Sequence, residues 1–142
     1  MIGGEPKVGY VLRYVYDWGA EAGTGSDKER PAVIVLTVRR ADGKTLVRVA
    51  PVTHRASDDP ARTLELPRAT KQRLGIDDDR SWVILDHANE FQWPGPDVRP
   101  VPGALPATIY YGPLPPALFA RLRQQLLGLF RAGRVRARLR LE

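Results

Sequence analysis

Cysteine is absent from this 142-residue sequence. Disulfide bonds and thiolate metal sites are therefore excluded, and a reducing compartment is compatible with the chain. The sequence has two histidines, His54 and His87, and neither lies in a ligand pattern such as HExxH. Motifs for a nucleophilic serine (GxSxG) and for nucleotide phosphates (GxxxxGK[ST]) are missing as well. We therefore expect neither a metal ion nor a cofactor.

Long hydrophobic runs are also missing. The N-terminal residues lack the basic and apolar regions of a signal peptide. The longest apolar runs are far shorter than the roughly 20 residues that a membrane-spanning helix needs. We expect a cytoplasmic protein without membrane contact.

Negative charge is scarce at the C-terminal end of the chain. Residues 1–120 hold fifteen basic and fifteen acidic residues, whereas residues 121–142 hold seven arginines and one acidic residue. The net charge of +6 therefore arises in the last 22 residues. This asymmetry favours a polyanionic partner, either nucleic acid or an acidic protein. A solvated basic tail that only aids solubility is the alternative.

Short apolar runs separated by turn residues dominate the rest of the chain. Thirteen prolines and thirteen glycines lie mostly between these runs, a pattern typical of brief strands. Strands are predicted at 8–16, 31–40, 45–54, 63–67, 81–86 and 107–112, with loops at 17–29 and through the proline-rich segment 89–106. The Asp42-Gly43 pair predicts a tight turn, so residues 32–54 should form a β-hairpin.

Two helices are expected. Residues 68–75 should form a short one that ends at Gly75. A longer one should begin at Pro115-Pro116 and end at Gly133. Leu118, Leu122, Leu126 and Phe130 recur along it every four residues, and Phe119, Leu127 and Leu129 lie beside them. Together they predict a core-facing stripe.

This composition favours a mainly β fold, a small barrel or roll with a C-terminal α-helix. We assign residues 1–133 to the barrel domain and 134–142 to a basic C-terminal tail. Arginine alternates with other residues in the tail. It can contact RNA or an acidic partner, trail in solvent, or add an edge strand to the sheet.

Candidate site residues lie where the predicted hairpin opens. Arg30 precedes the apolar run 31–40, and Thr53-His54 follows the run that pairs with it. An arginine, a hydroxyl and an imidazole at one end of a hairpin can clamp a phosphodiester. Asp86, at the end of the run 81–86, is a candidate base if that strand is a neighbour.

Aromatic side chains divide between core and surface. Tyr10, Tyr14 and Tyr16 share one side of the first strand, and most of them should be core. Trp93 lies in the proline-rich loop, where it can stack on an unpaired base. The alternative, which we favour, is that Phe91 and Trp93 fix the loop to the barrel.

Four segments together resemble the MazF/PemK toxin family, and more closely a PemK-like subgroup of growth inhibitors. They are ERPAVIVL (29–36), VRVAPVTH (47–54), SWVILD (81–86) and GPLPPALFARLR (112–123). The resemblance extends in order over residues 8–130. It implies an SH3-like small barrel of the MazF/CcdB type, a homodimer, and a cognate antitoxin protein as partner.

The resemblance also implies an activity. Family members cleave single-stranded RNA without metal, through attack of the 2′-OH on the adjacent phosphate. Arg30 then corresponds to a proton donor or phosphate stabiliser, Thr53 to a phosphate-positioning hydroxyl, and Asp86 to a possible base. Residues expected to bind RNA are His54, Glu29, Asn89 and Trp93.

Three departures from the family pattern are visible. The proline loop at 93–103 is longer than in ordinary members, and two segments are replaced. The segment GSDKE (25–29) replaces the usual Glu-Gln loop, and DHAN (86–89) replaces the usual DQxR. These changes affect cleavage specificity first. Alternative functions are a non-catalytic toxin that binds a protein target such as gyrase, and a small-barrel RNA-binding module.

Overall fold

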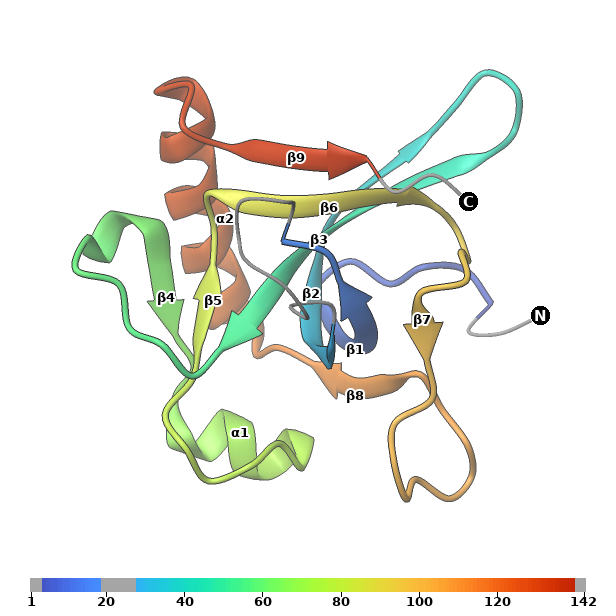
Figure 1. The fold of residues 1–142 in the computed structure, drawn as a ribbon, viewed down its shortest axis with the longest axis horizontal. Helices are drawn as coiled ribbons and strands as arrows, with labels where there is room; N and C mark the ends of the chain where they lie inside the picture. Colours follow the sequence, from blue (N-terminus) through green and yellow to red (C-terminus); the bar gives the residue numbers. More distant parts are fainter. Residues whose placement is uncertain (1–3, 19–27, 140–142) are drawn as a thin grey trace.

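The computed structural model describes residues 4–18 and 28–139. Strands β1 (Tyr10–Tyr16), β2 (Lys28–Arg39) and β3 (Thr45–Thr53) form an antiparallel meander at its centre (Figure 1). In the turn between β2 and β3, Gly43 has a φ of 85°, and the Asp42 carboxylate accepts a hydrogen bond from the Lys44 amide at 3.0 Å. The predicted hairpin is confirmed. Most of the predicted loop at 17–29 lies outside the described residues.

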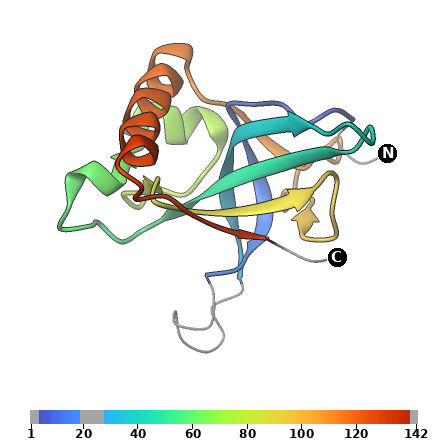
Figure 2. The same cartoon turned by 90° about the horizontal axis from the view of Figure 1, so that it is seen from above.

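Further strands extend both edges of this meander. On one edge, β1 pairs with β7 (Val98–Arg99) and β8 (Tyr110–Pro113). On the other, β3 pairs with both β5 (Trp82–Ile84) and β6 (His87–Gln92). Strand β4 (Thr63–Glu65), preceded by the 3₁₀ helix η2 (Pro60–Arg62), pairs with β5. Over the described ranges the sheet has nine strands, and it curls into a small barrel (Figures 1 and 2).

Strand β6 was not predicted, because residues 89–92 were assigned to the proline-rich loop. The first proline after β6 is Pro94, so the backbone up to Gln92 keeps its amides for pairing with β3. Polar residues in β6 hide this strand in the sequence. One of them, Asn89, is nevertheless fully buried.

The two faces of the meander carry separate hydrophobic clusters, as period-2 alternation requires. The barrel interior holds Leu12, Tyr14 and Tyr16 of β1, closed in by residues such as Phe91 and Ile109. Both Tyr14 and Tyr16 are fully buried, so the expectation that most of these tyrosines are core is confirmed. The opposite face, with Val11, Val33, Val35, Ala50 and Val52, is covered by the helices.

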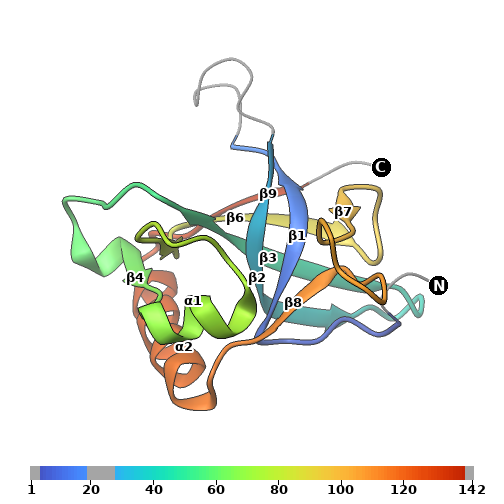
Figure 3. The same ribbon diagram turned by 90° about the horizontal axis from the view of Figure 1, so that it is seen from below.

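Both helices lie on that second face (Figure 3). Helix α1 (Arg68–Leu74) ends at Gly75, whose φ of 72° is left-handed as predicted. Helix α2 (Pro116–Arg131) begins after Pro115, also as predicted. It buries Leu118, Leu122 and Leu129.

The predicted stripe of α2 is confirmed at Leu129 and wrong at Phe130. Phe130 is 63% exposed, whereas Leu129 is 4% exposed. Each residue advances an α-helix by about 100°, so a spacing of four rotates the stripe by about 40° per step. Eleven residues bring Leu129 back to within about 20° of Leu118, while twelve leave Phe130 about 120° away.

The C-terminal residues of the described chain form strand β9 (Arg136–Leu139), which pairs in parallel with β6. All four of its residues are exposed. Among the alternatives for the tail, the structure therefore contains the edge strand. In the ranges that the structure describes, no helix combines the length and apolarity needed to cross a bilayer.

Candidate functional site

Two hollows on the surface differ in chemistry. The larger, about 520 Å³, lies between α2 and the sheet and is lined mostly by aliphatic side chains. None of the predicted site residues lines it. The smaller, about 410 Å³, lies at the open end of the β2–β3 hairpin and is lined by Arg30, Thr53 and His54, among others. This polar pocket brings together the residues predicted at the two hairpin ends.

The hairpin register explains why Arg30 and Thr53 meet. Ala32 lies opposite Pro51, so two further residues along each strand set Arg30 against Thr53. Both side chains leave the sheet on the face of the barrel interior, by the alternation of each strand. The Thr53 hydroxyl oxygen accepts a hydrogen bond from the Arg55 amide at 3.2 Å. The hydroxyl hydrogen of Thr53 is thus available for donation to a ligand.

Positive charge exceeds negative charge in this pocket. The cationic lining residues are Arg13, Lys28, Arg30 and Arg55, and the anionic ones are Glu29 and Asp77. Glu29 accepts from Arg13 at 3.2 Å, so its charge is already paired. Such a surface favours an anionic ligand. Arg13 and Arg55 were not predicted, although a single arginine inside the apolar run 8–16 is a readable signal for Arg13.

Arg30 is held against an aromatic cluster. Its guanidinium lies 5.4 Å from the centroid of the Trp18 ring. Trp18 packs in turn on Tyr16 at 4.8 Å and on His87 at 5.6 Å. Burial lowers the pKa of Arg30, and its Nε is buried without a hydrogen-bond partner in the described part of the chain. The guanidinium is therefore preorganised, with hydrogen-bonding capacity still unused.

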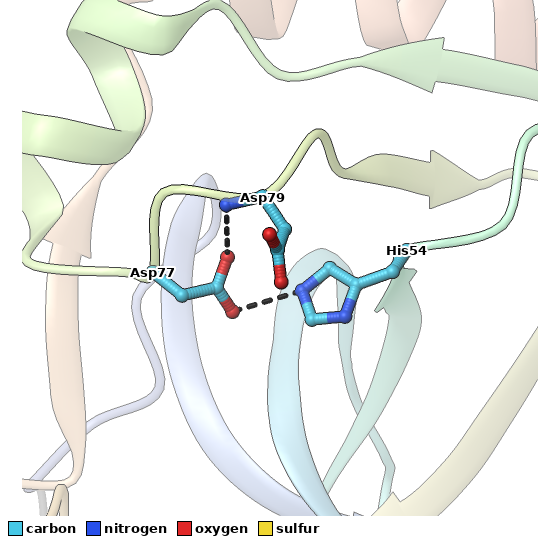
Figure 4. A group of neighbouring side chains, drawn as sticks. All are labelled: His54, Asp77 and Asp79. Carbon is cyan, nitrogen blue, oxygen red and sulfur yellow. Dashed lines mark hydrogen bonds and ion pairs between the residues drawn. The ribbon is translucent and has the colours of Figure 1, made fainter.

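His54 belongs to a polar group beside Thr53 (Figure 4). Its Nε2 lies 2.8 Å from Asp77 Oδ2, and Asp79 supplies a third ligand-type atom within 4.8 Å of both. These three are the described residues that could hold a metal ion. The buried ammonium of Lys71 already bonds to Asp77 at 2.7 Å and to the carbonyl oxygen of Asp79. The Lys71 ammonium thus already supplies a positive charge to this group, and no other feature of the described residues indicates a metal site.

Asp86 is placed apart from this pocket. It follows β5 at the corner that leads into β6, and it is not among the lining residues. Its carboxylate binds Arg62 at 2.5 Å, and its carbonyl oxygen accepts from the Arg136 amide at 2.9 Å. The antiparallel pairing of β5 with β3 explains the separation, because Trp82, at the start of β5, lies opposite Thr53. Asp86 therefore does not line the pocket with Arg30 and Thr53, although the charges of Asp86 and Arg30 both act on the Tyr16 hydroxyl.

Asn89 and Trp93 also lie outside the pocket. Asn89 is fully buried, and its side-chain amide bonds to both the amide and the carbonyl of Asp17 at 2.8 Å each. Trp93 donates from its indole to the Gly4 carbonyl at 2.7 Å and packs near Phe91. The Trp93 amide bonds to Thr45, at the opposite end of β3 from Thr53. Trp93 therefore fixes the proline-rich loop, the alternative favoured from the sequence.

The structure defines a class of protein. Its members have a small, strongly curled antiparallel barrel that is covered by helices on one face, and a pocket with an arginine and a threonine where a central hairpin opens. A chain in the form II crystal structure of the MazE-MazF complex from Deinococcus radiodurans has a similar fold. Its TM-score is 0.53 at 22% sequence identity, over 88% of this chain and 94% of that chain. Form III of the same complex matches with a TM-score of 0.53 and 22% identity, over 88% and 95% of the two chains. No family model and no curated protein matches the sequence. The chain has a MazF-like fold, and the predicted fold class is confirmed.

Proposed function

We propose that this chain is a metal-independent endoribonuclease that cleaves single-stranded RNA and acts as the toxin of a toxin–antitoxin pair. The observation that carries the proposal is the placement of Arg30 and Thr53 in one cationic pocket of a MazF-like fold. In the reaction, a 2′-OH attacks the adjacent phosphate. The products are a 2′,3′-cyclic phosphate and a 5′-OH end.

Arg30 and Thr53 would act on the phosphate. Arginine remains protonated in proteins, so we assign Arg30 to stabilising the charge of the pentavalent phosphate rather than to donating a proton. Its planar fork matches two phosphate oxygens. Thr53 donates its hydroxyl hydrogen to the same group. The additional cations Arg13, Lys28 and Arg55 would favour entry of the RNA backbone.

Partner and compartment follow from the same assignment. The similar structures were solved as MazE-MazF complexes, which supports a cognate antitoxin protein for this chain. A homodimer and a cytoplasmic location fit this role. The excess of arginine in the last 22 residues suits an acidic segment of such a partner.

The direct test is cleavage of labelled single-stranded RNA by the purified protein in EDTA. We expect Arg30→Ala and Thr53→Ala each to lower the rate about 100-fold, because a charge-assisted contact made in the transition state is worth about 3 kcal/mol. Arg39→Ala, which removes an exposed arginine at the opposite end of β2, should keep the wild-type rate.

Thermal unfolding of each variant checks that the fold is retained. Folded wild-type protein that leaves RNA intact under all conditions would contradict the nuclease assignment. RNA binding without cleavage would favour the RNA-binding module instead. A variant at Arg30 or Thr53 with near-wild-type rate would remove that residue from the site.

A further inference from the structure

The proposed cleavage needs a group that removes the proton of the attacking 2′-OH, and neither Arg30 nor Thr53 supplies one. Asp86 does not line the pocket and is held by Arg62. His87 is half-buried, and its Nδ1 is bonded to the Tyr16 hydroxyl at 2.6 Å. The base must therefore be sought among the other pocket residues.

We propose that His54 is the general base of this site and that Asp77 is the positioning residue that orients its imidazole; the assignment rests on the proposed nuclease function. His54 directly follows Thr53 in the chain, and both line the pocket with Arg30. The His54 side chain is 55% exposed, so an RNA strand in the pocket can reach it.

The hydrogen bond to Asp77 selects the tautomer that a base requires. Nε2 of His54 lies 2.8 Å from Asp77 Oδ2 (Figure 4). A carboxylate accepts only, so Nε2 carries the hydrogen and Nδ1 carries the lone pair. Within residues 4–18 and 28–139, Nδ1 has no hydrogen-bond partner. The basic nitrogen is therefore directed by the protein and open to substrate.

Asp77 is itself held in place. Its Oδ1 accepts from the ammonium of Lys71 at 2.7 Å and from the Asp79 amide at 3.1 Å. Lys71 is 4% exposed, so helix α1 fixes this ammonium in the protein. Burial by itself raises the pKa of Asp77, but the hydrogen bonds from Lys71 and His54 outweigh it and lower the pKa. Asp77 remains an anion that orients His54 and stabilises its protonated form.

The step balances without a co-reactant. His54 Nδ1 takes the proton of the 2′-OH while O2′ forms a bond to phosphorus. The bond from phosphorus to O5′ breaks, and O5′ leaves with the electron pair and takes a proton from water. The hydroxide so formed removes the proton from the imidazolium. One phosphodiester becomes a 2′,3′-cyclic phosphate and a 5′-OH, and the enzyme is restored.

Several charged groups lie near His54. Asp77 and Asp79 lie beside the ring, and Lys71 lies behind Asp77. The other charged residues that line the pocket are Arg13, Lys28, Glu29, Arg30 and Arg55. The pH dependence of cleavage therefore reports this whole group, and only the variant that removes the imidazole assigns a limb of the profile to His54.

The experiment is single-turnover cleavage of labelled single-stranded RNA in EDTA between pH 5 and 9. Wild-type log rate should rise with a slope near one through the range where histidines titrate and then level off. His54→Gln should lose this limb and at least 100-fold of the rate. Asp77→Asn should lower the rate by a smaller factor, because the bond remains while the charge is lost. His87→Gln, which removes the other histidine, should keep the limb, although the loss of its contact with Trp18 can lower the rate at every pH.

Binding of a 2′-deoxy substrate separates catalysis from recognition. His54→Gln should bind this uncleavable strand as the wild type does. If His54→Gln keeps both the limb and the rate while the Arg30 and Thr53 variants are impaired, the nuclease stands and the base assignment is overturned. If His54→Gln loses affinity in proportion to rate, His54 is a binding residue. If the wild type does not cleave, both assignments fall together.

Discussion

Two individual side chains, Asn89 and His87, fix the end of β1. Asn89 clamps both backbone polar groups of Asp17, and a buried amide with satisfied partners specifies one geometry. His87 bonds to Tyr16 and packs on Trp18, which in turn supports the Arg30 guanidinium. Asn89 was predicted to bind RNA. The structure instead buries it, and its side chain holds the backbone of Asp17, the residue before Trp18.

His87 should make stability depend on pH. Burial lowers the pKa of His87 below its ordinary value of 6.5. The unfolded chain therefore takes up a proton at a higher pH than the folded chain does. The contribution to the free energy of unfolding is complete above about pH 6.5 and decreases as the pH falls toward the folded-state pKa.

Urea unfolding between pH 5 and 8 measures this effect. His87→Gln should flatten the slope of stability against pH in the acidic half of that range. His54→Gln serves as the matched control, since it removes the exposed histidine. An unchanged slope in His87→Gln would show that the proton uptake arises elsewhere.

Among the secondary-structure elements, helix α2 departs from its sequence pattern. Its core contact follows the true helical period rather than the four-residue repeat of its large apolar side chains. We expect Leu129→Ala to cost about 2–5 kcal/mol of unfolding free energy, as for other buried leucines. Phe130→Ala should change it by on the order of 0.5 kcal/mol, because an exposed ring loses little packing. Chemical denaturation of the two variants measures both changes in unfolding free energy. A larger loss for Phe130→Ala than for Leu129→Ala would contradict this orientation of the helix.

Strand β9 gives the tail a structural role at this scale. Arg138 bonds to Asp17 at 2.5 Å, and Arg134 bonds to Asp59 at 2.6 Å. Deleting residues 134–142 lowers the net charge from +6 to +3. We expect the deletion to lower the melting temperature, because the β6 edge loses its partner strand.

The same deletion should leave the salt dependence of RNA binding nearly unchanged. Two of the tail arginines already bind carboxylates of the barrel, so we expect no phosphate contact from them. Titrations of labelled RNA over a range of salt measure the slope. A decrease of about 0.7 or more, the value for one phosphate contact of a single strand, would instead place the tail on the RNA.

For the whole molecule, most of what could be predicted from the sequence follows from local residue patterns. The Asp42-Gly43 turn starts the hairpin, but its register shifts by one residue between Ile34 and Leu36. Only after this shift does Ala32 lie opposite Pro51, so that Arg30 and Thr53 follow on neighbouring strands. A local pattern also marks the end of α1 at Gly75. The fold class followed from many short strands and one amphipathic helix.

The remainder depends on tertiary placement that no local pattern encodes. Asp77 is 23 residues from His54 in the chain. It reaches the pocket because it follows α1, whose Leu74 packs in the same cluster as Val33 and Val52 of the hairpin. Lys71 is buried on that helix although its sequence neighbours are polar. Asp86 was a candidate base on the condition that its strand neighbours the hairpin, and β5 does pair with β3. The direction of β5 nevertheless leads Asp86 away from the pocket.

Mapping of 5′-OH RNA ends after induced expression is the decisive test of RNA cleavage by this protein. Expression without a partner protein should arrest growth and produce new 5′-OH ends in cellular RNA. Arg30→Ala, expressed to the same level, should produce neither, because the phosphate loses its guanidinium contact. Normal growth with intact RNA, in cells that contain folded wild-type protein, would contradict the account.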